Sequence, residues 1–388
     1  MAKKAYIGVD NVARKIKKGY VGVDGVARKI KKAYIGIGGV ARPCWSGGEL
    51  AYYGAITGLS KARRYLAAAS IGNYALFGGG DAAGSFSNVV DAYDKSLTRS
   101  TATTLSRGRS YLSATSNSGY ALFAGGDYAT NYPSVNVDAY NSSLTRSSAP
   151  DMSMDRTYIG AAKIGDYAVF AGGSARSSSN NAGQLVEAYD ASLTKTTPEQ
   201  LSAKLRALGA ATVSDYAVFA GGMGWSTNYE TTVNAYNVSL TRSIPTALSA
   251  GRNSLIGASV GDYALFAGGN KGKTTTSGEV TNLVEAYNKS LTRSIPTALS
   301  EAKYEMAATS LEDFALFMGG RALGLATMYA TVEVYDASLT RTIAANGLSQ
   351  ARAEFTATSF GDFAIAGGGY YYKSSGTYQT VVDVYTVA

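Results

Sequence analysis

Two positions recur along this chain with residue types that suit ligand binding. The first lies eleven residues before the aromatic residue that opens each of seven apolar runs, and six of its seven copies are basic: Arg63, Arg109, Arg156, Arg252, Lys303 and Arg352. The second, two residues later, holds Tyr65, Tyr111, Tyr158, Ala207, Ser254, Glu305 and Glu354. If this face opens at a common mouth, its tyrosine, arginine and glutamate side chains can stack on and hydrogen-bond a sugar or an anionic glycan.

The two glutamates also raise the question of catalysis. Glu305 and Glu354 fall in adjacent copies, and a pair of carboxyl groups can serve as acid and base in glycan hydrolysis or epimerisation. Carboxylates this close to basic residues are more often held in ion pairs. We therefore expect ligand binding at this face and assign no catalytic residue.

A second set of candidate ligand contacts comes from seven loops, each of which follows a double glycine and differs from the others in length and composition. Two examples are MGWSTNYETT and YYYKSSGTYQT. Their aromatic residues Trp225, Tyr229, Tyr329 and Tyr371 are candidates, because aromatic side chains exposed on loops mark binding sites. Packing of these loops against their neighbours is the alternative role.

The residue types that are missing narrow the chemistry further. The 388 residues contain no histidine and a single cysteine, Cys44. This excludes a histidine-based triad, an imidazole-ligated metal, a disulfide framework and a cysteine-cluster metal site, and we expect no cofactor. The chain has no run of about 18 apolar residues and no apolar leader segment, so we expect neither membrane insertion nor a signal peptide.

The segments that carry these positions repeat every 46–51 residues, a period typical of propeller blades. Each repeat has an apolar run such as YALFA, a double glycine, a variable polar loop, a segment such as VVDAYD and, in six copies of seven, SLTR or SLTK. The seven double glycines are Gly78–Gly79, Gly125–Gly126, Gly172–Gly173, Gly221–Gly222, Gly268–Gly269, Gly319–Gly320 and Gly367–Gly368. The pattern predicts an all-β fold, a seven-bladed β-propeller with four strands in each blade.

The repeat resembles the kelch-repeat β-propellers over roughly residues 50–388. The resemblance is carried by the double glycine that closes the second strand, the Tyr-Asp or Tyr-Asn that closes the third, and the basic residue that opens the next unit. The tryptophan usual in that family after the Tyr-Asp turn is absent, and the Ser-Leu-Thr-Arg turn occupies its neighbourhood. The resemblance implies that the variable loops share one rim with the basic residues.

The same resemblance offers a second role for the basic residues and bears on catalysis. In kelch units such residues routinely bond neighbouring backbone carbonyls, which is the alternative to ligand contact. A copper oxidase of this class needs histidine ligands and a cysteine-linked tyrosine, and sialidase-type propellers carry Asp-box turns. Neither set is found in this sequence, which favours a protein that binds without catalysing.

The two ends of the propeller sequence predict how its ring closes. The seventh copy stops at VVDVYTVA, after its third strand, and so lacks a fourth. The stretch at about residues 51–59 aligns with the fourth-strand exits of other copies and has no double glycine before it. We expect this N-terminal strand to complete the last blade, which leaves no unpaired edge at the join.

A different repeat precedes the propeller, in residues 1–49. It has a period of 14 residues: KKAYIGVDNVARKI, KKGYVGVDGVARKI and KKAYIGIGGVARPC. Asp-Asn, Asp-Gly and Gly-Gly pairs suit two-residue hairpin turns, so each unit predicts a hairpin and the three together a small meander of about six strands. Residues 1–42 carry eleven Lys and Arg against Asp10 and Asp24, a net charge of +9, whereas the remainder has 25 basic and 26 acidic residues.

The N-terminal repeat also suggests where the protein works. These 14-residue units are similar to repeats at the start of bacteriophage and prophage tail or virion proteins. We therefore expect a virion protein made in the cytoplasm of a bacterial host, in which residues 1–49 bind other virion subunits and support a homo-oligomer, and the propeller rim of residues 50–388 binds a host-surface glycan or protein. We expect the basic residues of the hairpins to form a solvated face that blunts exposed strand edges, with an anion-binding surface for nucleic acid or membrane as the alternative. A structural decoration subunit and a cytoplasmic protein-binding adaptor are the alternatives.

Overall fold

The computed structural model describes residues 48–176, 182–224, 228–271, 279–324, 327–372 and 376–387, together with the backbone of six short strands between residues 6 and 46. Apart from the single 3-10 turn η1 (Ala182–Gln184), the regular structure of these residues is entirely strand. Within this part of the chain, no helix has the length and apolar character needed to cross a lipid bilayer.

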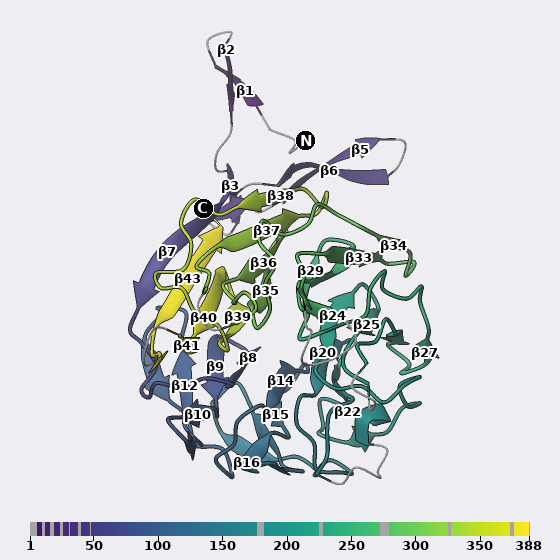
Figure 1. Ribbon diagram of the computed structural model, residues 1–388. Helices are drawn as coiled ribbons and strands as arrows, with labels where there is room; N and C mark the ends of the chain where they lie inside the picture. Colours follow the sequence, from purple (N-terminus) through teal and green to yellow (C-terminus); the bar gives the residue numbers. More distant parts are fainter. Residues whose placement is uncertain are drawn as a thin grey trace.

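Seven four-stranded antiparallel sheets are arranged in a ring around a central axis (Figure 1). The innermost strands contact one another in chain order, and the last of them also contacts the first, so the ring is closed. These innermost strands are β8 (Ala67–Ile71), β14 (Ser113–Ser116), β20 (Gly160–Ile164), β24 (Gly209–Val213), β29 (Ile256–Val260), β35 (Ala307–Leu311) and β39 (Thr356–Phe360). The all-β propeller expected from the repeats is confirmed.

The other three strands of each blade follow outward from the axis. The second strands are β9 (Tyr74–Gly78), β15 (Ala121–Ala124), β21 (Tyr167–Ala171), β25 (Tyr216–Ala220), β30 (Tyr263–Ala267), β36 (Phe314–Met318) and β40 (Phe363–Gly367). The third strands are β12 (Val90–Tyr93), β18 (Val137–Tyr140), β22 (Val186–Tyr189), β26 (Val233–Asn237), β33 (Val284–Asn288), β37 (Val332–Asp336) and β43 (Val382–Val387). The outer strands are β13 (Arg99–Thr101), β19 (Arg146–Ser148), β23 (Lys195–Thr196), β27 (Arg242–Ser243), β34 (Arg293–Ser294), β38 (Arg341–Ile343) and β7 (Leu50–Ile56).

Short strands in the loops between the second and third strands, joined in one blade by the strand β28 that precedes the innermost strand, build one rim of the ring. They are β10 (Asp81–Ala82) with β11 (Ser85–Phe86), β16 (Asp127–Ala129) with β17 (Tyr132–Pro133), β28 (Arg252–Asn253) with β31 (Asn270–Lys271) and β32 (Glu279–Val280), and β41 (Tyr370–Tyr371) with β42 (Thr377–Tyr378). The loops therefore have regular backbone of their own, which positions their side chains.

The hydrophobic core lies between the blades. The second and third strands are buried on both faces, as their apolar runs predict. Seven clusters of buried side chains each join two neighbouring sheets. One of them packs Val382 and Val384 of the last sheet against Phe77 of the first. The interface across the two chain ends is therefore built like the others.

A buried basic residue ties the strands together in six of the seven blades. Arg63 is fully buried, and its guanidinium donates to the carbonyl oxygens of Gly79 (2.8 Å) and Val89 (2.7 Å) and forms an ion pair with Asp91 on the third strand. The corresponding pairs are Arg109–Asp138, Arg156–Glu187, Arg252–Glu285, Lys303–Glu333 and Arg352–Asp383. Carbonyl oxygens and one carboxylate together satisfy a charge that burial would otherwise make costly.

The fourth blade lacks both halves of this pair. Leu205 stands at the basic position and Asn234 at the acidic position, and both are buried. The amide oxygen of Asn234 still accepts a hydrogen bond from the backbone N–H of Ser202 (3.0 Å), the bond that Asp138 accepts from Ser106 (3.1 Å) in the second blade. With leucine in place of arginine, the acidic position no longer needs a negative charge. It still needs an oxygen atom to accept the hydrogen bond from Ser202.

The double glycines form the contacts between blades. Gly80 donates its N–H to the carbonyl oxygen of Arg109 in the next blade (2.8 Å), and an equivalent bond is present at all seven junctions, including Gly369 to Arg63 (2.7 Å). A Cβ on Gly79 would lie 2.7 Å from the Arg109 oxygen, and the φ of Gly79 is +72°. Glycine is needed here for both reasons.

The structure corrects the position of the double glycine in two blades. In the first and seventh blades the pairs equivalent to Gly125–Gly126 are Gly79–Gly80 and Gly368–Gly369, one residue later than the sequence alignment has them. Gly78 and Gly367 belong instead to the ends of strands β9 and β40. Three consecutive glycines in these blades made the register ambiguous.

The Ser-Leu-Thr-Arg segment forms the outer hairpin turn. In the first blade, Asp94 ends the third strand, and its carboxylate accepts hydrogen bonds from the backbone N–H groups of Ser96 and Thr98. Leu97 between them has a φ of +61° and is buried. The side-chain cap and the burial of the leucine stabilise a backbone conformation that leucine rarely adopts.

The N-terminal strand closes the ring by a pairing that spans nearly the whole chain. Strand β7 pairs antiparallel with β43 and becomes the outer strand of the seventh blade (Figure 1). Tyr52 pairs with Tyr385, the register position that Arg146 takes opposite Tyr140, and its hydroxyl donates to Asp383 (2.7 Å). Tyr52 therefore replaces the arginine of the missing SLTR turn.

Each of the three 14-residue units forms a hairpin. The pairs are β1 (Tyr6–Val9) with β2 (Val12–Lys15), β3 (Gly19–Val23) with β4 (Val26–Ile30), and β5 (Lys32–Ile37) with β6 (Val40–Ser46). The turn pairs Asp10–Asn11, Asp24–Gly25 and Gly38–Gly39 lie outside the described residues. The expected meander is wrong for the described strands, because they form three separate two-stranded sheets. Lys and Arg in the returning sequences disfavour strand addition at these edges.

The fourth blade provides a control for the buried ion pairs. Arg109→Leu removes the buried partner of Asp138, whose carboxylate keeps only its more exposed ion pair with Arg146 (2.8 Å), and is expected to lower the free energy of unfolding by up to about 3–5 kcal/mol. The double change Arg109→Leu with Asp138→Asn copies the Leu205 and Asn234 combination and should recover most of that loss. Urea unfolding of both variants and of the unmodified protein measures the difference. A double variant no more stable than the single one would contradict this account of the pair.

Candidate functional site

The six basic candidates do not line the mouth of the ring, which corrects the expectation from the sequence. Arg63, Arg109, Arg156, Arg252, Lys303 and Arg352 are all completely buried. Their charged groups are occupied by third-strand carboxylates or backbone carbonyls, as the alternative role implied. Because their charged groups are already paired within the blades, they support the site without belonging to it.

The residues two positions further on do converge around the axis. All seven, Tyr65, Tyr111, Tyr158, Ala207, Ser254, Glu305 and Glu354, have a positive φ between 51° and 59°. Six backbone hydrogen bonds link neighbours among them, for example from Tyr111 N–H to the oxygen of Tyr65 and from Tyr65 N–H to that of Glu354, both 2.9 Å. This belt sets side chains from seven blades close together, with tyrosines on one side and glutamates on the other.

The three tyrosines form a continuous aromatic wall. The ring centroids of Tyr65 and Tyr111 are 3.9 Å apart in a stacked arrangement, and those of Tyr111 and Tyr158 are 4.7 Å apart. Tyr158 is 39% exposed and ends the wall on the solvent side. Burial raises the pKa of all three phenols, so they stay neutral and act by stacking and hydrogen bonding.

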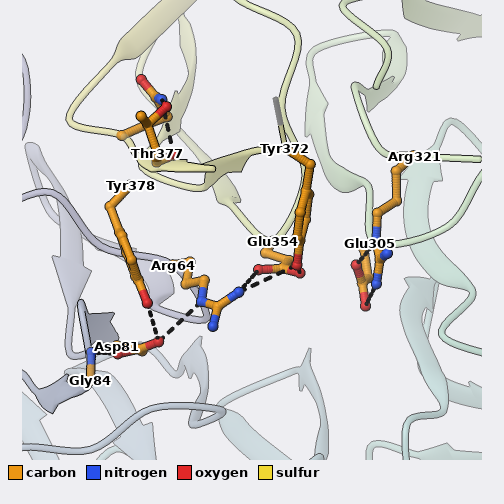
Figure 2. A network of polar contacts seen from close by, with 10 residues as sticks. Arg64, Asp81, Gly84, Glu305, Arg321, Glu354, Tyr372, Thr377 and Tyr378 are labelled. Atoms are coloured by element: carbon orange, nitrogen blue, oxygen red, sulfur yellow. Dashed lines mark hydrogen bonds and ion pairs between the residues drawn. The ribbon is translucent and has the colours of Figure 1, made fainter. Parts of the chain in front are cut away.

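The acidic side of the mouth is held by two arginines that the repeat analysis did not single out. Figure 2 shows Arg64 between Asp81 and Glu354, with both charged contacts at 3.0 Å. Arg321 forms an ion pair with Glu305, and the hydroxyl of Tyr372 donates to Glu354. Burial opposes the charge of Arg64, but Glu354 and Asp81 outweigh that effect and raise its pKa.

The two glutamates influence each other. Burial raises the pKa of Glu305, and the neighbouring carboxylate of Glu354 adds to that rise, while the hydrogen bond from Arg321 reduces it. Glu305 therefore holds a proton at higher pH than an ordinary glutamate does. Because each carboxylate is already paired with an arginine, this side of the mouth is a neutralised network rather than a free acid and base.

Beside the aromatic wall, a cup of about 550 Å³ opens over the first four blades. Its lining residues include the aromatic Phe86, Tyr111 and Tyr158, the acidic Asp81 and Asp127, the basic Arg176 and Arg206, and the hydroxyl-bearing Ser110, Thr130, Thr157 and Ser174. Such a volume lies within the usual range for small-molecule sites, roughly 300–1,000 Å³. The cup thus combines aromatic side chains with both donors and acceptors of hydrogen bonds.

The loop aromatics chosen from the sequence lie elsewhere. Tyr229, Tyr329 and Tyr371 belong to loops of the fourth, sixth and seventh blades, are half-buried, and do not line the cup. Tyr329 lies 5.6 Å from the Lys303 ammonium by its ring centroid, and Tyr371 pairs with Thr377 in a loop hairpin. Trp225 lies outside the described residues. The three described tyrosines are therefore not part of the cup.

The residues that sequence reasoning missed have one signal in common. Arg64 and Arg206 directly follow the basic position, and Asp81, Asp127 and Arg321 directly follow the double glycine. At both places the residue type changes from blade to blade while its neighbours recur. Variation inside an otherwise regular repeat is thus the feature that indicates the site. Among the described residues, no group of three or more His, Cys, Asp and Glu side chains is placed to hold a metal ion.

The raised pKa of Glu305 leads to a prediction about stability. In the unfolded chain Glu305 ionises at the ordinary glutamate value, whereas in the folded protein it keeps its proton to a higher pH. Its contribution to stability is therefore present at low pH and is lost as the pH rises through the folded pKa. We expect Glu305→Gln to flatten the fall in unfolding midpoint over that interval, measured by thermal unfolding at a series of pH values. Glu279→Gln, at an exposed loop glutamate, is the control, and an identical slope for Glu305→Gln and the unmodified protein would contradict the assignment.

Comparison with known proteins supports the architecture alone. No family model matches the chain, and no curated protein matches it. Among solved structures, the chain is similar to one described as "Structure of YjhT", with a TM-score of 0.59 and 12% sequence identity, over 74% of this chain and 99% of that one. At this identity the similarity shows a shared β-propeller-type fold.

Proposed function

We propose that this protein is a non-enzymatic saccharide-binding propeller, and that its N-terminal hairpins attach it to a larger assembly. The observation that carries the proposal is the cup, in which the tyrosine wall meets carboxylate, guanidinium and hydroxyl groups in a cavity of about 550 Å³. Sugars present apolar faces and a rim of hydroxyl groups. Aromatic rings can pack against those faces, while the polar side chains of the cup exchange hydrogen bonds with the hydroxyls.

The arrangement of the acidic groups favours binding over catalysis. Glu305 and Glu354 are ion-paired with Arg321 and Arg64, and neither glutamate lines the cup. No enzyme family is evident from the comparisons. Neither carboxylate is therefore placed to exchange a proton with a ligand in the cup, which supports a role in shaping the mouth.

The assembly role is supported by the N-terminal sequence. The three hairpins are separate two-stranded sheets, and such small sheets gain stability by association. Their resemblance to repeats of bacteriophage tail and virion proteins is the support for a virion as the assembly. In this proposal residues 1–49 bind other virion subunits or further copies of the chain, and the cup faces a glycan or glycoprotein on the host surface.

A substitution in the tyrosine wall tests the binding proposal. Tyr158→Ala is tolerated by the backbone, because Ala207 takes the same positive-φ position in the fourth blade. Losing the exposed ring should weaken saccharide binding by about 1–2 kcal/mol, since an aromatic contact of this kind contributes on that order. Glycan-array and whole-cell binding of the full chain measure the effect. Tyr53→Ala, at an exposed tyrosine of the outer strand β7, is the control.

Two results would count against saccharide binding at the cup. One is the absence of any glycan or cell binding by the unmodified protein, which is the behaviour of a purely structural decoration subunit. The other is equal binding by Tyr158→Ala and the unmodified protein, which would place the ligand away from the cup.

A truncation tests the assembly proposal. Removing residues 1–47 retains every strand of the seven sheets, because the closing strand begins at Leu50. The shortened protein is expected to stay folded and monomeric, with the thermal unfolding midpoint of the propeller, but to lose self-association and attachment. Light scattering and co-sedimentation with virion fractions provide the measurement. Retention of the full-length oligomeric state after truncation would show that the hairpins do not mediate assembly.

A further inference from the structure

One acidic residue in the cup wall differs from its counterparts in neighbouring blades. Asp127 follows the double glycine of the second blade and is only 9% exposed. Its Oδ1 atom has no hydrogen-bond partner among the described residues. Asp81, at the same position of the first blade, is paired with Arg64 and accepts hydrogen bonds from Tyr378 (2.9 Å) and the backbone of Gly84 (2.8 Å). The carboxylate at this position is therefore satisfied in one blade and has an unpartnered oxygen in the next.

A second unsatisfied group accompanies Asp127. Ser110 forms a cross-strand backbone pair with Asp127, with N–H to oxygen distances of 2.7 and 2.9 Å, and both residues line the cup. The Ser110 hydroxyl is buried, with 1% of the residue exposed, and also has no partner among the described residues. Buried polar groups are nearly always hydrogen-bonded, and an exception beside a cavity points to a partner that comes from outside.

The charges around Asp127 do not neutralise it. The other ionisable groups that line the cup are Asp81, Arg176, Arg206, Tyr111 and Tyr158. Arg176 bonds the hydroxyl of Tyr132, and the hydrogen bond shown for the Arg206 guanidinium goes to the sulfur of Met223. No ion pair to Asp127 is present in the described part of the chain. Burial without a cation raises the pKa of Asp127 to about 6.

We propose that Asp127 and Ser110 form the subsite of the cup that takes a saccharide hydroxyl group, and that this subsite binds most tightly when Asp127 is ionised. The ligand O–H donates to the Asp127 carboxylate while its oxygen accepts from the Ser110 hydroxyl. A hydroxyl group can do both at once, whereas an ammonium group cannot accept and a carboxylate cannot donate. This inference rests on the proposed function and adds the group that is recognised and its dependence on pH.

The direction of the pH dependence follows from the hydrogen bonds. A hydrogen bond donated to the carboxylate stabilises its charged form, so the bound ligand lowers the pKa of Asp127. Protons and the ligand therefore compete for the same oxygen. Binding is tightest at a pH above the pKa of the free carboxyl group and weakens below it, by about tenfold once the carboxyl group is fully protonated. A ligand released in this way would bind at neutral pH and dissociate in a mildly acidic medium.

The test uses the full chain and a panel of methyl glycosides of neutral hexoses and hexosamides as probes. Saturation-transfer NMR identifies the glycosides that bind, and calorimetry follows the tightest of them from pH 8 down to about pH 4.5, a range that brackets the ionisation of a buried carboxyl group. Asp127→Asn keeps the shape and the acceptor oxygen but removes the charge. It is expected to bind about tenfold more weakly at pH 8, because a charged acceptor makes the stronger bond, and to show no pH dependence.

Two further variants complete the comparison. Ser110→Ala should weaken binding and keep the pH dependence. Asp190→Asn is the matched control, because it removes an aspartate charge at an outer turn where the second and fourth blades already have Asn141 and Asn237. This control should leave both the affinity and its pH profile unchanged.

A measurement without ligand separates this inference from the proposed function. At neutral pH the folded protein must keep the charged Asp127 carboxylate in a buried place, which lowers its stability. Asp127→Asn should therefore raise the unfolding midpoint at pH 8 and leave it unchanged near pH 4. If a glycoside binds but Asp127→Asn retains the pH dependence of the unmodified protein, the subsite is wrong and the proposed function stands. If no glycoside binds while the stability profile shifts as expected, the proposed function fails and the subsite assignment falls with it.

Discussion

The buried pair of a basic side chain with a third-strand carboxylate is the interaction on which the rest of this structure depends. In the first blade, Arg63 joins Asp91 to the carbonyl oxygens on both sides of the variable loop, and its own carbonyl accepts a bond from Gly369 of the last blade. One residue thus connects strands within a blade and blades to each other. Because a buried guanidinium must be completely satisfied, its neighbours have little freedom to change.

This constraint decides where a binding site can form. The basic residue, the carboxylate and the double glycine are fully used by the scaffold, so they recur with the repeat. The residues that directly follow them, such as Arg64, Asp81 and Asp127, lie on the loop side, and their side chains are not needed to hold the blades together. They differ between blades, and the mouth is consequently asymmetric, with an aromatic wall on one side and paired glutamates on the other. The fourth blade shows the same constraint inside the scaffold, because the basic residue and the carboxylate are both replaced there, by Leu205 and Asn234.

Most of the architecture was predictable because its signals are local. Apolar runs of five residues, glycine pairs and the SLTR turns each act over a few residues, and their seven-fold recurrence left little choice of fold. Ring closure was also accessible, because a third strand without a fourth requires a partner, and β7 supplies it. The register of the three consecutive glycines could not be predicted, because Gly78 and Gly79 are the same residue type. Only the hydrogen bond from Gly80 to Arg109 in the structure distinguishes them.

Less of the candidate site than of the fold could be predicted from the sequence. The sequence by itself determined that tyrosines and glutamates recur at one position of the innermost segment, and that no histidine or disulfide chemistry is available. Only the tertiary structure decided that Arg109 is buried while Arg64 reaches the mouth, and that Asp127 lacks the partners that Asp81 has. The physical reason is that burial and charge pairing depend on what neighbouring blades place around a side chain. Residues remote in sequence supply those surroundings, as Glu354 does for Arg64.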